Sequence, residues 1–153
     1  MTDSNPVTST PRLNRLSYIG WNVLLCLGIA VVLFIILIFL PNTLNFIQNN
    51  AENLATQILL YIFNLIFLIP VMIISAKRLH DFNVSGWFAL LELVPIVNII
   101  FPIALMFIPG SKGNNKFGEP RESKTWEVVL AFIFAAIALF ILVNLLFALK
   151  YFL

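Results

Sequence analysis

Residues 86–110 read GWFALLELVPIVNIIFPIALMFIPG, an apolar stretch that is interrupted by Glu92, Pro95, Asn98 and Pro102. A helix needs about 20 apolar residues to cross a hydrocarbon core about 30 Å thick, so the stretch is long enough to span a membrane. Proline, however, removes a backbone donor and kinks or breaks a helix. Two alternatives follow: a kinked helix that crosses the membrane, or a re-entrant helical hairpin that dips in and returns to its own side.

The composition of the whole chain is that of a membrane protein. Of the 153 residues, 61% are hydrophobic and 10% are charged, whereas a soluble domain averages about 45–50% apolar and about 25% charged residues. The length indicates one domain. The single cysteine, Cys26, allows no disulfide within the chain, and no Cys/His spacing indicates a metal or cofactor site. The net charge of +2 is too small to indicate nucleic-acid binding.

Four apolar segments of membrane length are predicted, at about residues 18–40, 54–75, 87–108 and 126–149. The sequence thus predicts an all-α integral membrane protein with residues 12–153 as a single membrane domain. The polar residues 1–11 are expected to form a disordered tail. Small residues share one face of the fourth segment and are expected to pack against the first segment or against another copy: Ala131, Ala135 and Ala138.

The distribution of basic residues favours the hairpin. If all four segments cross and the N-terminus is cytoplasmic, five of the nine basic residues lie inside and four outside, which fits the positive-inside rule poorly. If the third segment re-enters, eight lie inside and only Lys150 lies outside. We therefore expect a cytoplasmic N-terminus and favour the re-entrant hairpin, while the kinked spanning helix stays the alternative.

Two motifs flank the third segment, AKRLHDFNVSGW at residues 76–87 and PGSKGNNKFG at residues 109–118. Together with RLNRLSYIGWN at residues 12–22, they resemble the DUF805 family of bacterial inner-membrane proteins. The resemblance covers roughly residues 12–120 and implies a multi-pass protein of the bacterial inner membrane, without implying an activity. Besides the RLHD letters, the matching positions are Ser85, Gly86, Trp87, Pro95, Pro109, Gly110, Gly113, Asn115, Phe117 and Gly118.

The RLHD box is the first candidate site. On a helix, Arg78 and Asp81 share a face and can form an ion pair, whereas His80 and Asp81 do not face each other. In the alternative, Lys77 and Arg78 extend to lipid phosphates. No nucleophile with a supporting pattern accompanies the box, so no catalytic residue is assigned. We also expect Ser85 to cap the third segment, because serine is a preferred N-cap residue.

Glu92 and the loop at residues 109–118 complete the candidate polar platform. An acid inside an apolar segment is costly unless it is paired, and Lys77 or Arg78 could pair with Glu92 if the segment folds back. The glycine-rich loop is either a structured turn or an anion-binding nest. In the hairpin, the loop and the RLHD box lie on one side, so the candidate binding residues come together: Lys77, Arg78, His80, Asp81, Glu92 and Asn115.

These features favour a non-enzymatic scaffold of the cell envelope that recruits a partner through a cytoplasmic platform. The expected partners are the bilayer, anionic lipid head groups, an unidentified membrane or envelope protein and further copies of the chain; no cofactor, metal or nucleic acid is expected. The alternative is a subunit of a small oligomeric channel or transporter that uses the broken third helix. A membrane enzyme acting on lipid ranks last.

Overall fold

The computed structural model describes residues 12–152, and all regular elements in that range are helical. The prediction of a disordered tail falls on residues 1–11, outside the described residues. The elements are α1 (Arg15–Phe39), α2 (Thr43–Asn49), α3 (Leu54–Asp81), the 3₁₀ helix η1 (Gly86–Leu93), α4 (Val97–Phe107) and α5 (Thr125–Phe152). Within that range, the extended pairing is limited to one isolated bridge between Asn115 and Gly118.

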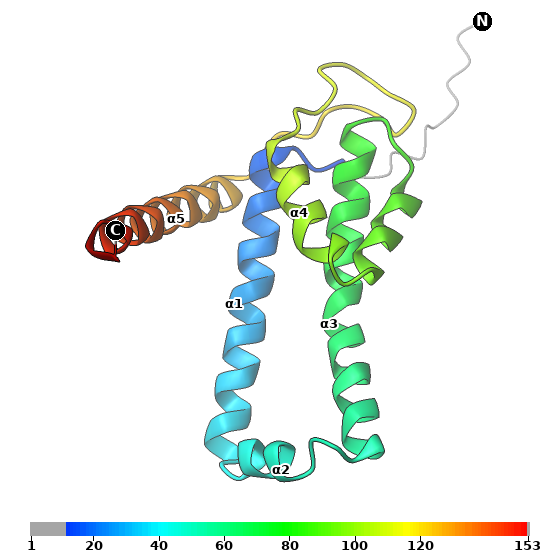
Figure 1. The fold of residues 1–153 in the computed structure, drawn as a ribbon. Coiled ribbons are helices and arrows are strands. Elements are labelled where there is room, and N and C mark those ends of the chain that lie inside the picture. Colours follow the sequence, from blue (N-terminus) through cyan, green and yellow to red (C-terminus); the bar gives the residue numbers. More distant parts are fainter. Residues whose placement is uncertain (1–11, 153) are drawn as a thin grey trace, which may run out of the picture.

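Helices α1 and α3 form an antiparallel pair that α2 joins at one end (Figure 1). An asparagine precedes each helix, and the side chains of Asn14 and Asn53 accept hydrogen bonds from the backbone N–H groups of Ser17 and Ala55 in the first turns of α1 and α3. Three helices of the described chain, α1, α3 and α5, are long and apolar enough to cross a membrane. The short helix α2 was not predicted from the sequence.

The third apolar segment consists of two short helices, η1 and α4, which are separated by a turn at residues 94–96. Pro95 lies in that turn, where a proline removes no helical hydrogen bond. The segment folds back, because the backbone N–H of Ser111 donates to the carbonyl of Asp81 at 2.8 Å. Both of its ends therefore lie at the C-terminal end of α3 (Figure 1).

The predicted cap of this segment is wrong in one respect. Ser85 occupies the N-cap position of η1, but its side chain makes no capping hydrogen bond. A 3₁₀ helix leaves fewer N–H groups unsatisfied at its start than an α-helix, because its hydrogen bonds connect residues three apart. The backbone carbonyl of Ser85 instead accepts from the N–H of Phe88 at 3.3 Å.

Helix α5 leaves the α1–α3 pair at a steep angle (Figure 1). It contacts α1 near the starts of both helices, where the rings of Trp21 and Trp126 meet edge to face at 5.2 Å. Of the predicted small-residue face, Ala131 is buried, whereas Ala135 and Ala138 are exposed. The prediction that the fourth segment packs against the first therefore holds for its first two turns.

The apolar core lies at the end of the molecule where α1 starts, α3 ends and the arms of the third segment meet. Its buried members come from five different segments and are Leu13, Tyr18, Ile74, Leu79, Ala89 and Leu105. The remaining length of α1 and α3 exposes large apolar side chains, such as Phe34 and Tyr61. Those surfaces suit contact with lipid, which is as apolar as the side chains.

Candidate functional site

The RLHD box forms the last turn of α3, and its charged side chains are buried. Arg78 and Asp81 stand three residues apart on one helix face, and Nη1 of Arg78 donates to Oδ2 of Asp81 at 2.5 Å. Arg78 is 0% exposed and Asp81 4%. The alternative in which Arg78 extends to lipid head groups is therefore wrong, because the guanidinium is enclosed by protein and packs over the ring of Phe82.

A second arginine shares the same carboxylate. Arg12 precedes α1, and its Nε and Nη2 donate to Oδ1 of Asp81 at 3.2 and 3.0 Å. Arg12 is 1% exposed, so a single carboxylate lies between two buried guanidinium groups. Ion pairs taken out of water are stable only when the remaining donors are also satisfied. The other N–H groups of both arginines must therefore find acceptors.

Backbone carbonyls supply those acceptors. Arg78 donates to the carbonyls of Leu13, Leu105 and Ile108. Arg12 donates to the carbonyls of the loop after α4, and these belong to Ser111, Gly113 and Gly118. The loop thus turns its carbonyls toward a cation, so the anion nest considered from the sequence is not what these residues form. We call Arg12, Arg78, Asp81 and their carbonyl partners the arginine clasp.

Small residues let the loop approach the clasp. A Cβ atom at Gly110 would overlap the carboxylate of Asp81. Gly118 has φ 112°, a left-handed conformation that L side chains rarely adopt. Its N–H donates to the carbonyl of Asn115 at 3.0 Å, and the N–H of Asn115 returns a bond of 3.1 Å to Gly118. The glycines of this motif therefore serve close approach and a tight turn.

His80 faces away from Asp81 and stacks on the loop. Its ring lies 3.9 Å from that of Phe117 with an interplanar angle of 15°. The side chain of Asn115 donates to the carbonyl of His80 at 2.9 Å, which fixes the loop to the last turn of α3. Beneath the histidine, Gly86 leaves no room for a Cβ, which would lie 2.9 Å from Nε2 of His80. Trp87 follows on the surface and is 78% exposed.

Glu92 lies apart from the clasp in a cluster with two hydroxyl groups. The hydroxyl of Ser75 donates to Oε1 of Glu92 at 2.5 Å, and the phenol of Tyr18 lies 3.2 Å from the same hydroxyl. The predicted pairing of Glu92 with Lys77 or Arg78 is therefore wrong. Three elements, α1, α3 and η1, contribute one side chain each, and all three are buried.

A third polar cluster, which no local pattern in the sequence predicts, fixes the start of α5. Glu127 is 0% exposed and accepts four hydrogen bonds. Oε1 accepts from Trp21 at 2.9 Å and from Arg121 at 2.6 Å. Oε2 accepts from the hydroxyl of Ser17 at 2.6 Å and from the backbone N–H of Lys124 at 2.8 Å. The last bond is half of a capping box, but Lys124 stands where that motif has serine or threonine, so the pattern does not stand out in the sequence.

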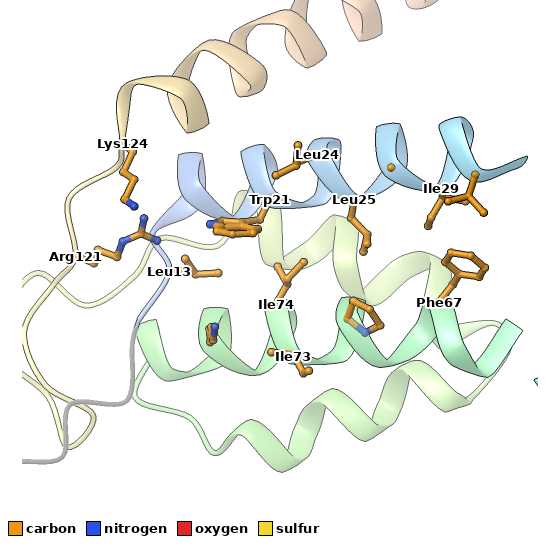
Figure 2. Close-up of a pocket in the computed structure, with 14 residues that line it drawn as sticks. Leu13, Trp21, Leu24, Leu25, Ile29, Phe67, Ile73, Ile74, Arg121 and Lys124 are labelled. Carbon is orange, nitrogen blue, oxygen red and sulfur yellow. The ribbon is translucent and has the colours of Figure 1, made fainter. Parts of the chain in front are cut away.

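The six predicted binding residues thus separate into three groups. The clasp and the loop bring together Arg78, His80, Asp81 and Asn115. Glu92 belongs to the hydroxyl cluster, and Lys77 lines a groove between α1 and α3 that Figure 2 shows. Within residues 12–152, no group of three His, Cys, Asp or Glu side chains lies close enough to hold a metal ion.

Comparison with known proteins places the chain in a family. The model of the family described as "Protein of unknown function (DUF805)" matches residues 7–119. The chain belongs to the DUF805 family. The match includes Arg12, the RLHD box and the loop up to Gly118, but it ends before α5. The arginine clasp therefore lies entirely within the family's part of the chain, whereas Glu127 lies beyond it.

Two curated relatives carry a descriptive name. The inner membrane protein YhaH, from two strains of Escherichia coli, is 27% identical over 90 residues, which cover 59% of this chain and 71% of the relative. No solved structure matches. Together with the three membrane-length helices, these findings identify an integral membrane protein of a family whose biochemical role is unknown.

Proposed function

We propose that the protein is a non-enzymatic scaffold of the bacterial cell envelope that recruits a partner protein through the loop of residues 108–124. The observation that carries the proposal is that this loop of 17 residues, from the end of α4 to the start of α5, is fixed by buried groups. Loops longer than about 12–15 residues without helices or strands are uncommon and usually functional. The arginine clasp gives this one a defined shape.

The outward face of the loop is available to a partner. The exposed side chains along it carry charges of both signs, Lys112 and Lys116 first and then Glu119 and Glu122. Two acids beside the loop are engaged in structural contacts, since Asp81 accepts from two arginines and Glu127 from four donors. A rigid loop with exposed charges above a membrane domain suits recognition, because it presents them without the entropic cost of ordering.

Site-specific photo-crosslinking in intact bacteria tests this role. A photoreactive amino acid replaces Lys112, Lys116 or Glu119, one at a time, and the control position is Gln48 on α2 at the opposite end. The proposal expects one protein to be crosslinked from several loop positions and not from Gln48. If the loop positions give the same products as Gln48, or only lipid, the recruiting role is wrong.

We also propose that η1 and α4 re-enter the membrane from the cytoplasmic side of a bacterial inner membrane. The 11 residues of α4 extend about 16 Å and the 8 residues of η1 a similar distance, about half of a core about 30 Å thick. In that arrangement eight of the nine basic residues lie on the cytoplasmic side. The printed name of the curated relatives supports the inner membrane as the location.

Cysteine accessibility tests the topology. Because Cys26 is exposed, it is first replaced by serine, and single cysteines are then placed at Lys77, Lys116 and Asn50. Re-entry predicts that the positions 77 and 116 react from the cytoplasmic side and that position 50 reacts from the periplasmic side. Labelling of positions 77 and 116 from opposite sides would establish a spanning third segment.

A transporter subunit is the second candidate, and Glu92 is the observation that favours it. Oε2 of Glu92 is buried and has no hydrogen-bond partner among the described residues, in a cluster to which three elements contribute. However, Ser75 lies two residues from Lys77, about 3 Å along α3, and the re-entrant arrangement places Lys77 on the cytoplasmic side. The cluster therefore lies nearer the interface than mid-membrane. The test is solute flux into proteoliposomes that contain the protein. If the protein moves a solute and Glu92→Leu abolishes that flux, the transporter function is correct and the scaffold role is wrong.

A further inference from the structure

A groove of about 690 Å³ lies between α1 and α3, outside the arginine clasp. Its walls are apolar along both helices, with Leu25 and Ile29 on one side and Phe67 and Ile74 on the other (Figure 2). At one end, the lining residues are basic: Lys77, Arg121 and Lys124. Lys77 lies at the same end, because its backbone carbonyl accepts a hydrogen bond from the N–H of Leu13. Figure 2 shows Leu13 next to Arg121.

The basic end carries uncompensated charge. Of its three cations, Arg121 is paired with Glu127, whereas Lys77 and Lys124 take part in none of the ion pairs of the described residues. Three cations and one carboxylate leave a charge of +2, and the residues that line the groove include no acid. A ligand that fits this end is therefore anionic, and a cationic head group would find no acceptor.

The length of the apolar part matches one leaflet of a bilayer. Along α3, Lys77 and Phe67 are ten residues apart, which corresponds to about 15 Å. Along α1, Trp21 and Val32 are eleven residues apart, or about 16 Å. Half of a hydrocarbon core about 30 Å thick is also about 15 Å. The basic end then lies at the level of the head groups, where three membrane-length helices place their polar ends.

We infer that this groove binds an anionic glycerophospholipid, with an acyl chain between α1 and α3 and the phosphate at Lys77, Arg121 and Lys124. Basic pockets between membrane helices recognise anionic head groups in this way. Gly28 has no side chain to fill the groove, and the space beside it is open, since a Cβ atom there would meet nothing within 4 Å. The inference does not depend on the scaffold role, since the groove is lined by Arg121 and Lys124 at the end of the loop, whereas the exposed residues Lys112, Lys116 and Glu119 do not line it.

The test uses a phosphatidylglycerol probe with a photoreactive group on its acyl chain, and a phosphatidylcholine probe with the same chain, each at a small mole fraction in phosphatidylcholine vesicles. The expected adducts of the phosphatidylglycerol probe map to residues 21–32 and 67–74. Lys77→Gln and Lys124→Gln should each lower its preference over the phosphatidylcholine probe by about fivefold. Lys112→Gln, an equal loss of charge on the exposed loop, should leave that preference unchanged.

A variant that fills the groove tests the acyl chain separately. Gly28→Phe places a ring in the open space and should lower the yield of adducts in the groove at least fivefold, whereas Val31→Phe, at an exposed position outside the lining, should not. Adducts spread evenly around α1, equal labelling by both probes, or a crosslinked second copy of the chain in place of lipid would each overturn the inference. Tryptophan emission of every variant checks that the fold is retained.

Discussion

The two ends of the α1–α3 pair are held together by different forces. At one end lie all three ion pairs of the described residues, the buried core and the loop of residues 108–124. At the other end, α2 and its flanking turns, residues 40–53, contain no lysine or arginine, and their apolar side chains are exposed except for the half-buried Ile47. Lipid is as apolar as these side chains, so helix contacts there gain little from burial. Tertiary specificity therefore resides in the polar end.

Removing the shared carboxylate should break the polar end most severely. Asp81→Asn leaves two buried guanidinium groups without their counter-ion, and breaking a buried pair costs about 3–5 kcal/mol. The free energy of unfolding in micelles or bilayers should fall by that amount. Glu122→Gln, which removes an exposed acid from the same loop, is the control and should change it by less than about 0.5 kcal/mol. Equal stability of both variants would mean that the clasp contributes nothing.

Helix α1 offers a matched pair of glycines, of which only Gly20 contacts α5. A Cβ at Gly20 would lie 2.6 Å from the carbonyl oxygen of Glu127, whereas one at Gly28 meets nothing. Gly20→Ala should lower the free energy of unfolding by about 1–3 kcal/mol, because backbone atoms must move apart. Gly28→Ala should be neutral or stabilising, because alanine favours a helix. A loss of the same size in both variants would contradict the close crossing.

Glu127→Gln should have a smaller effect at the same crossing. The glutamine has one oxygen, so it cannot accept the four hydrogen bonds that the carboxylate accepts from Ser17, Trp21, Arg121 and Lys124. We expect a loss of about 1–2 kcal/mol, as for hydrogen bonds to a charged group. Tryptophan emission should change with it, because Trp21 loses a charged acceptor. Unchanged emission and stability would place Trp21 and Glu127 apart.

The opposite end should respond least. Asn53→Ala removes the side chain that caps α3, and a lost N-cap costs about 1 kcal/mol. The effect should stay local: hydrogen exchange should become faster in the first turn of α3, and the exchange rates in the loop of residues 108–124 should not change. If this variant destabilised the loop as much as Asp81→Asn does, the two ends would be one cooperative unit.

Local patterns predicted the helices well and long-range contacts poorly. The apolar run predicts a first segment at about residues 18–40 and α1 covers Arg15–Phe39, because apolar length alone defines such a helix. The apolar run predicts that the second segment ends at about residue 75, yet α3 continues to Asp81. Its charged last turn stays helical because the arginine clasp satisfies it. Hydropathy cannot show that, because it scores those residues as polar.

The same distinction holds for the site. The pair of Arg78 and Asp81 follows from a spacing of three on a helix. The sequence does not indicate Arg12 as a site residue, because 69 residues separate it from Asp81 and no local pattern links them. Glu127 was overlooked as one acid at the start of an apolar segment, and its partners Ser17 and Trp21 lie on a distant helix. The family motifs indicate that the loop is part of the site. They do not indicate that the backbone carbonyls of the loop face an arginine.

Hydrogen exchange of the loop amides in a lipid bilayer tests the central claim most directly. The N–H groups of Ser111, Asn115 and Gly118 donate to backbone carbonyls, whereas those of Gly113 and Asn114 make no hydrogen bond within residues 12–152. The clasp predicts that the first three exchange slowly, that Gly113 and Asn114 exchange fast, and that Asp81→Asn removes the difference. Fast exchange of all five amides in the unaltered protein would contradict a loop fixed on the end of α3.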